Sequence, residues 1–161
     1  MSTSTAFFRK NKWSRVFLYA ACAAAAVYAM IYADVVLRAR HAYLEGEKYM
    51  SWHRDPSLKE TALREDLKKT SEKLEKELKK GTISKKEYDR RLETEEFVFN
   101  RRLEESSVKY AYVWYQTTVE LFSPPESRWV KLARQKMSSA RELWKQELNS
   151  KNIPFEEYML E

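Results

Sequence analysis

Residues 16–33, VFLYAACAAAAVYAMIYA, form an apolar stretch without a charged residue, a glycine or a proline. A helix rises about 1.5 Å per residue, so this stretch covers about 27 Å, close to the roughly 30 Å hydrocarbon thickness of a bilayer. Trp13 precedes it, and Tyr28 and Tyr32 lie toward its far end, where aromatic rings suit the two membrane interfaces. The sequence therefore predicts a transmembrane helix over 16–37.

Asp34 marks the far boundary of the predicted span. A carboxylate at the bilayer centre would cost about 2.5–3.5 kcal/mol, so we expect Asp34 in the headgroup zone. Arg38 follows one helical turn later and is expected to pair with it. The apolar residues at 35–37 extend the span past Asp34.

Two other interpretations of this N-terminal region stay open. A cleaved signal peptide also has a basic start, which residues 9–15 supply, and small residues later on. A lipoprotein signal ending at Cys22 would have only the apolar residues 16–21 before the cysteine, which is too short a core. The length of the apolar stretch favours the transmembrane interpretation.

The orientation of the span is argued from its flanking charges. Four Lys or Arg residues precede the span and four follow it within about twenty residues, so the positive-inside rule is nearly balanced. An uncleaved leader of this form favours a short N-terminus inside and the body outside. We expect an inner or plasma membrane, with a periplasmic body in a bacterium; a mitochondrial inner membrane is the alternative.

The part of the chain after the span suits one compact helical domain. The 161 residues include only two glycines and four prolines, which favours helix throughout. The single cysteine, Cys22, lies in the span, so the body has no disulfide or cysteine metal site. His41 and His53 are far apart and lack nearby acidic ligands, so we expect neither a metal site nor a cofactor.

Residues 55–105 predict a charged helical hairpin. Asp55-Pro56 starts its first helix as cap and first residue, and Gly81 fits the left-handed position after that helix. Ser84-x-x-Glu87 is a capping box that starts the second helix. Because the connection is short, the two helices are expected to be antiparallel.

The turn at the centre of residues 78–92, KGTISKKEY, resembles the helix-turn-helix of the short SHOCT module. The resemblance covers about twenty residues and implies a short helical hairpin. Further along, Tyr88, Phe99, Tyr110 and Leu121 recur every eleven residues, which keeps one apolar stripe along a long helix. Since 85–122 lacks proline and glycine, we expect one helix of about 55 Å there.

Residues 108–122, VKYAYVWYQTTVELF, are apolar or aromatic on almost every side of a helix. Such a helix must be buried on every face, either at the centre of a small head or under another protein. Ser123-Pro124-Pro125-Glu126 then predicts a break, with Ser123 as cap of a helix over 125–150. The apolar tail is expected to dock on the head: Phe155, Tyr158, Met159 and Leu160.

The predicted fold is all-α: a single N-terminal transmembrane helix, a long antiparallel helical hairpin and a small aromatic-rich helical head. The expected units follow the chain in order. They are a basic leader over 1–15, the transmembrane helix over 16–37, a juxtamembrane helix over 38–54, the hairpin over 55–105 and the head with its docked tail over 106–161.

The spacing Ala133-x3-Met137-x2-Ala140 is similar to the small–large–small pattern in the second helix of a tetratricopeptide repeat. The better copy covers about 111–144, and a fainter one covers 42–52, with Gly46 and Tyr49. The connection SPPES is longer than the turn of that family, and no proline closes the unit. The resemblance implies a helix-pair scaffold that binds proteins; generic helix packing is the alternative explanation. The first helix of the better copy would use Trp114, Thr118 and Leu121.

The sequence lacks the common catalytic motifs, with no GxGxxG, P-loop, HExxH or paired cysteines, so we expect no enzyme and no small-molecule substrate. The predicted function is a non-catalytic, membrane-anchored scaffold, adaptor or accessory subunit that contacts proteins of a larger membrane complex. The alternative is a tetratricopeptide-like module that binds peptides or associates with itself. The expected partner-binding residues are Tyr110, Trp114, Tyr115, Trp129 and Trp144.

Residues 128–151 carry a basic excess, with seven Lys or Arg residues against two Glu. A solvated helix face explains this excess, but it also permits binding to anionic lipid or to nucleic acid. Because no motif for recognising nucleic-acid bases accompanies the charges, no nucleic acid is expected as a partner. The candidates for an anionic surface are Arg128, Lys131, Arg134, Lys136 and Arg141.

Overall fold

The structure is a computed structural model that describes residues 12–160. Its regular elements are α2 (Lys12–Arg54), α3 (Pro56–Lys79), α4 (Lys85–Glu104), α5 (Ser107–Leu121), α6 (Arg128–Ser150) and the short 3₁₀ helix η1 (Glu157–Leu160). No strand occurs among these described residues, which confirms the predicted all-α class. Most of the predicted basic leader, residues 1–11, lies outside this part of the chain.

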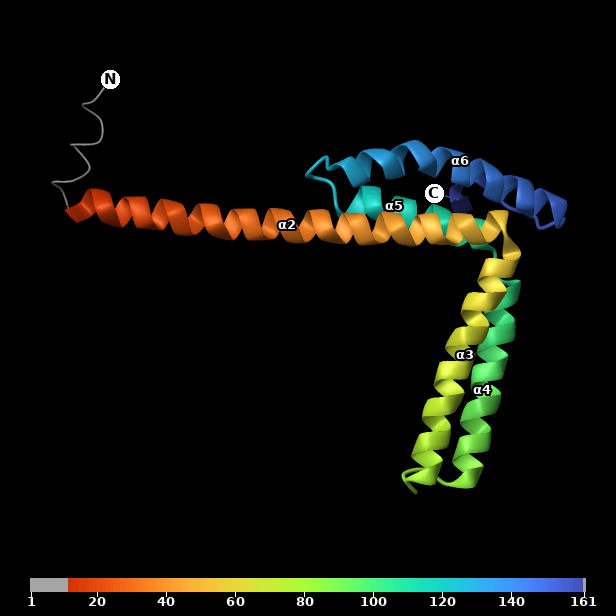
Figure 1. Cartoon of the computed structure of the whole chain (residues 1–161). Coiled ribbons are helices and arrows are strands. Elements are labelled where there is room, and N and C mark those ends of the chain that lie inside the picture. The colour runs from red at the N-terminus through yellow and green to blue at the C-terminus, as the bar shows by residue number, and fades with distance from the viewer. Residues whose placement is uncertain (1–11, 161) are drawn as a thin grey trace.

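Helix α2 is a rod of 43 residues that carries the rest of the protein on its C-terminal half. In Figure 1, α5 and α6 lie along that half, and α3 and α4 project together from its end. Every residue from 15 to 34 is exposed, whereas Ala39, Ala42 and Tyr43 are buried. The predicted span and juxtamembrane helix are therefore one unbroken helix, half bare and half packed.

Gly46 allows α2 and α5 to approach closely. A Cβ atom at this position would lie 2.6 Å from Cε1 of Tyr115, whose ring is completely buried. Any larger residue would push α5 away from α2. Glycine is unfavourable within a helix, so its presence here reflects packing.

Helices α3 and α4 lie side by side as an arm with a thin apolar seam (Figure 1). The Asp55 side chain caps α3 by accepting a hydrogen bond from the Ser57 backbone N–H at 3.0 Å. Gly81 has a φ of 71°, as expected for the left-handed position after a helix. The seam buries Leu63, Leu74 and Ile83, while charged residues cover the outside. We refer to these two helices as the α3–α4 arm.

The single helix expected over 85–122 is wrong, because α4 ends at Glu104 and α5 begins at Ser107. The buried Lys59 side chain of α3 stabilises the break. Its ammonium donates to the backbone oxygens of Leu103 at 3.0 Å and Glu105 at 2.6 Å, which satisfies carbonyls at the end of α4. Ser106 then caps α5 by accepting from the backbone N–H of Lys109, and the chain turns toward the head.

The predicted start of the last long helix is also wrong. Helix α6 begins at Arg128 with Ser127 as its cap, whereas Ser123 was the expected cap and residue 125 the expected start. Consecutive prolines keep the residues before them out of the helical region, so the helix starts only after them. The Ser123 hydroxyl instead donates to the Glu126 carboxylate at 3.1 Å.

The core of the head lies between α2, α5 and α6, and α5 is its middle helix. Tyr115, Val108 and Ala111 of α5 have no exposed surface. However, Leu121 at the end of α5 is 71% exposed, so the expectation that this helix is buried on every face is wrong there. The other buried members of the core are Tyr43, Met50, Tyr112, Ala133, Ala140, Trp144 and Leu160.

The C-terminal tail docks mainly through Leu160. Leu160 is buried, and its backbone oxygen accepts a hydrogen bond from the Tyr112 hydroxyl at 2.8 Å. Phe155 is half-buried against the core, whereas Tyr158 is exposed, so the predicted docking is wrong for Tyr158. The side chain of Met159, also predicted to dock, lies outside the described part of the structure.

Candidate functional site

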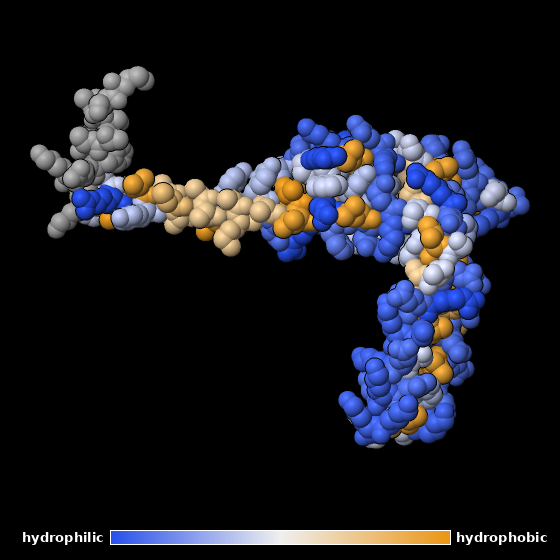
Figure 2. All heavy atoms as spheres, in the orientation of Figure 1, coloured by the Kyte–Doolittle hydropathy of each residue, from blue (hydrophilic) through white to orange (hydrophobic). Residues whose placement is uncertain are grey.

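The bare half of α2 is a long, exposed apolar surface. It is the one described helix that is long and apolar enough to cross a membrane, and none of its apolar window is buried. Figure 2 shows this surface as a continuous pale to orange rod between blue ends. Its largest exposed side chains are Phe17, Leu18, Tyr19, Val27, Tyr28, Met30 and Ile31.

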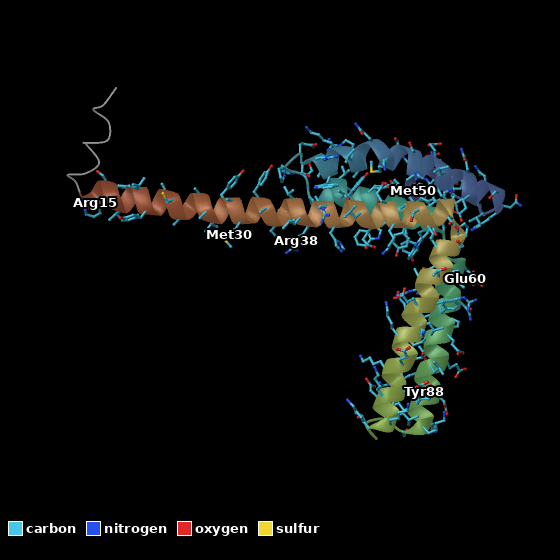
Figure 3. The ribbon with its side chains drawn as sticks, in the orientation of Figure 1. Arg15, Met30, Arg38, Met50, Glu60 and Tyr88 are labelled. Atoms are coloured by element: carbon cyan, nitrogen blue, oxygen red, sulfur yellow. The ribbon has the colours of Figure 1, made fainter. Side chains whose placement is uncertain are left out.

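Charged residues bound this surface at both ends. Figure 3 shows Arg15 at the free end of α2, Met30 along the bare half and Arg38 where the head begins. The guanidinium Nε of Arg38 lies 2.8 Å from Oδ2 of Asp34, as the sequence predicts. This pair places the first acidic side chain of α2 at the end of the apolar stretch.

Ring contacts fix how the head lies on α2. The ring of Tyr110 stacks on Tyr49 at 5.2 Å, and the ring of Tyr115 lies 6.0 Å from Tyr43. Helix α5 therefore runs antiparallel to α2. Trp129, near the start of α6, lies 5.6 Å from Tyr43, so the turn between α5 and α6 is at the end of the head nearest the bare half.

A half-buried carboxylate links the three helices of the head. Glu47 accepts hydrogen bonds from the Tyr115 hydroxyl at 2.5 Å and from the Lys136 ammonium at 2.7 and 2.6 Å. Burial raises the pKa of Glu47, but the hydrogen bonds from Lys136 and Tyr115 outweigh it and hold the pKa below its ordinary 4.5. Burial, with Glu47 next to it, raises the pKa of Tyr115. The network is structural, because each of its polar groups already has a partner.

The five predicted partner-binding aromatics do not form one surface. Tyr115 is completely buried and Trp144 is 9% exposed, so both belong to the core of the head. Trp129 is half-buried at the end of the head nearest the bare half of α2, with the guanidinium carbons of Arg40 and Arg128 each 5.7 Å from its ring. Trp114 is also half-buried, and Tyr110 lies at the opposite end of the head.

The predicted anionic-surface residues divide into two groups. Those further along α6 are neutralised: Lys136 by Glu47, and Arg141 by Glu157 at 3.4 Å. Arg134 lies nearer the start of the helix but pairs with Glu126 at 2.7 Å. Arg128 and Lys131 are exposed close to the start of α6. The positive charge of Arg128 and Lys131 is therefore concentrated at one end of the head.

A cavity of about 330 Å³ lies at the elbow where the α3–α4 arm meets the head. Its aromatic wall consists of Tyr49, Trp52 and Tyr110, with Tyr49 and Trp52 in an edge-to-face contact at 5.0 Å. The Lys48 ammonium lies 5.1 and 5.3 Å from the rings of Tyr49 and Trp52. The remaining lining is Lys59, Leu63, Asp66, Arg101, Arg102 and Glu105.

We call this feature the elbow cavity. Sequence reasoning identified Tyr110 but missed the rest of the lining, because the other residues come from α2, α3 and the end of α4. Only the break between α4 and α5 brings them together. Aromatic rings beside exposed arginines are the side chains that dominate binding energy at protein interfaces.

The described residues contain no group of three or more His, Cys, Asp or Glu side chains placed to hold a metal ion. Comparison with protein-family models, with curated proteins and with solved structures finds no match for this chain. A functional assignment therefore depends on the bare half of α2, the head and the elbow cavity.

Proposed function

We propose that this protein is a non-catalytic, single-pass membrane scaffold or accessory subunit that holds a protein partner against its helical body. One observation carries the proposal: the apolar half of α2 is completely bare and continues without a break into the packed half. Soluble proteins rarely expose contiguous apolar patches larger than a few hundred Å². Lipid is the environment that removes such a surface from water.

The continuous helix couples the anchor rigidly to the body. Residues 34–54 belong to the same helix as the apolar stretch, and α5 and α6 pack on them. A partner bound to the body is thereby held at a fixed distance from the membrane. The α3–α4 arm projects sideways from the far end of this rod (Figure 1), which suits contact with a neighbouring subunit.

The elbow cavity is the proposed contact site for that partner. It combines three aromatic rings with Arg101, Arg102 and Lys48, so it suits a protein segment that carries aromatic and acidic side chains. The tetratricopeptide-like alternative requires a groove lined by Trp114, Tyr115, Trp129 and Trp144. Because Tyr115 and Trp144 belong to the core, we favour the elbow cavity.

Site-specific photo-crosslinking in intact membranes tests the partner site. A benzophenone amino acid replaces Trp52 in the elbow cavity or, as a matched aromatic control, Tyr88 at the far end of the arm (Figure 3). We expect one discrete crosslinked protein from position 52 and none from position 88. The proposal is contradicted if position 52 gives no crosslink or the same products as position 88.

Sidedness is proposed from the leader, with the short N-terminus inside and the body outside. Protease protection of the C-terminal body in sealed membranes tests this orientation. In spheroplasts or right-side-out vesicles, added protease should digest the body without detergent. A body that is degraded only after the membrane is opened would reverse the orientation.

A further inference from the structure

We propose that the turn between α5 and α6, residues 121–128, is a second membrane-binding element that lies in the headgroup layer and binds lipid phosphates. The inference rests on the proposed anchoring of α2 and goes beyond it. It assigns to the head a lipid contact of its own. We call residues 121–128 the α5–α6 turn.

The geometry of the head places this turn at headgroup depth. Tyr43 is ten residues past Ala33, or about 15 Å along α2 from the end of the apolar stretch. Tyr115 lies beside Tyr43, and Leu121 is six residues further along antiparallel α5, or about 9 Å back toward the membrane. Leu121 therefore lies about 6 Å from the end of the stretch. Each headgroup layer is roughly 5–7 Å thick.

The side chains of the turn suit this depth. Leu121 is a large apolar residue with 71% of its surface exposed, although the rest of α5 is mostly packed. Phe122 is half-buried beside it, and Pro124 is exposed. Figure 2 shows orange residues gathered where the bare rod meets the head. Immersion in the interface would remove the Leu121 side chain from water.

Basic side chains surround the turn on the side of α2. The guanidinium groups of Arg40 on α2 and Arg128 on α6 each lie 5.7 Å from the Trp129 ring, so both cations are at the same end of the head. Lys131 follows Arg128 by almost one helical turn and is exposed. Guanidinium groups bind phosphate oxygens in a fork geometry, and an ammonium adds a point charge.

The acidic residues of this region already have partners. Asp34 pairs with Arg38 at 2.8 Å, and Glu126 pairs with Arg134 at 2.7 Å. Glu120, the remaining acidic residue, accepts a hydrogen bond from Gln116 at 2.9 Å. Counting Arg38, Arg40, Arg128, Lys131 and Arg134 against Asp34, Glu120 and Glu126, the region keeps an excess of two positive charges. This excess favours an anionic leaflet.

A depth measurement with a fluorophore tests the inference on the full chain in vesicles of phosphatidylcholine and phosphatidylglycerol. In a Cys22→Ala background, Leu121→Cys carries the fluorophore at the turn, and Lys86→Cys carries it on the exposed arm as a control. The native Cys22, labelled in the unchanged chain, reports on the anchor. Lipids brominated near the headgroup or deep in the acyl chain act as quenchers.

We expect the label at position 121 to be quenched at least twofold by shallow bromine, and the label at position 86 to be unaffected. If position 121 behaves like position 86 while Cys22 is quenched by deep bromine, the inference is wrong and the proposed anchoring stands. If Cys22 is not quenched either, the anchoring itself is wrong and the inference falls with it.

A charge reversal tests the phosphate contact. Arg128→Glu combined with Lys131→Glu should at least halve the ratio of quenching at position 121 by headgroup-brominated phosphatidylglycerol to quenching by headgroup-brominated phosphatidylcholine, and high salt should do the same. The matched control, Lys86→Glu with Arg90→Glu on the exposed face of α4, should leave it unchanged at equal helicity. An equal ratio in both double variants would overturn the role of Arg128 and Lys131.

Discussion

Glu47 of α2 and Lys136 of α6 form an ion pair across the head, with the ammonium 2.7 and 2.6 Å from the two carboxylate oxygens. The Tyr115 hydroxyl of α5 donates to the same carboxylate at 2.5 Å. One side chain thus connects three helices that are distant in the sequence. Glu47 is next to Gly46, where the ring of Tyr115 on α5 lies close to the backbone of α2.

Replacing Glu47 should weaken the head. In Glu47→Gln, the charge that balances Lys136 is lost and the Tyr115 hydroxyl keeps a weaker acceptor, so we expect a loss of about 1–3 kcal/mol in unfolding free energy. Chemical unfolding in detergent, followed by tryptophan fluorescence, measures it. The control Glu65→Gln removes a fully exposed pair with Lys69 and should leave stability almost unchanged. Equal effects would show that Glu47 has no special role.

Stability should fall in acid. The pKa values of Glu47 and Glu147 both lie below 4.5. Burial raises each pKa, but hydrogen bonds lower it by a larger amount. For Glu147, these hydrogen bonds come from Lys151 and Ser106. The unfolded chain therefore binds protons at higher pH than the folded chain, and the stabilisation present above about pH 4.5 is lost as the pH falls through the folded-state values.

The measurement is the unfolding midpoint between pH 7 and pH 3. The unchanged chain should lose stability below about pH 4.5, and the double variant Glu47→Gln with Glu147→Gln should show a shallower decline from a lower starting value. If the unfolding midpoint falls equally steeply with pH in both proteins, these two carboxylates do not cause the loss of stability in acid.

Gly46→Ala should destabilise the head although alanine is the better helix former. The added Cβ would lie 2.6 Å from the buried Tyr115 ring, and we expect a net loss of about 1–3 kcal/mol. Gly81→Ala is the comparison, because nothing lies within 4 Å of its Cβ and only its φ of 71° opposes the change. It should cost about 1 kcal/mol and melt only the end of the arm. A stabilised Gly46→Ala protein would refute the close approach of α5.

Lys59→Met should loosen the joint between the arm and the head. The substitution keeps the length of the side chain but leaves the backbone oxygens of Leu103 and Glu105 without their donor, at a cost of about 1–3 kcal/mol. Hydrogen exchange should increase at residues 101–110 in particular. Lys68→Met on the exposed side of α3 is the control and should leave exchange unchanged. If protection from hydrogen exchange at residues 101–110 is the same in Lys59→Met as in the unchanged protein, this lysine does not stabilise the break.

The helix starts and stops that depend on local chemistry were predictable from the sequence. Asp55, Gly81 and Ser84 act as the capping rules predict, since each acts on residues within one or two turns of itself. The Asp34–Arg38 pair was predictable for the same reason. The apolar stretch was recognised by its length and by the absence of charge.

The break between α4 and α5 depends only in part on local chemistry: Ser106 is a local cap, but Lys59, which donates to the carbonyls at the end of α4, is more than forty residues away in the sequence. The same applies to the elbow cavity, whose lining comes together only after that break. The sequence also did not predict which aromatic residues are exposed. Tyr115 and Trp129 are both large aromatic residues in helices, yet Tyr115 is in the core and Trp129 is at the rim of the head. Periodicity identifies an apolar stripe, but not what covers it.

The most direct test of the central claim uses Cys22, the only cysteine of the chain, so no substitution is needed. A nitroxide attached to Cys22 in reconstituted vesicles is examined by electron paramagnetic resonance, with oxygen and a water-soluble nickel complex as competing relaxation agents. A transmembrane α2 predicts strong relaxation by oxygen and almost none by nickel, without detergent present. Relaxation by nickel equal to that of a label on the exposed arm would contradict the account.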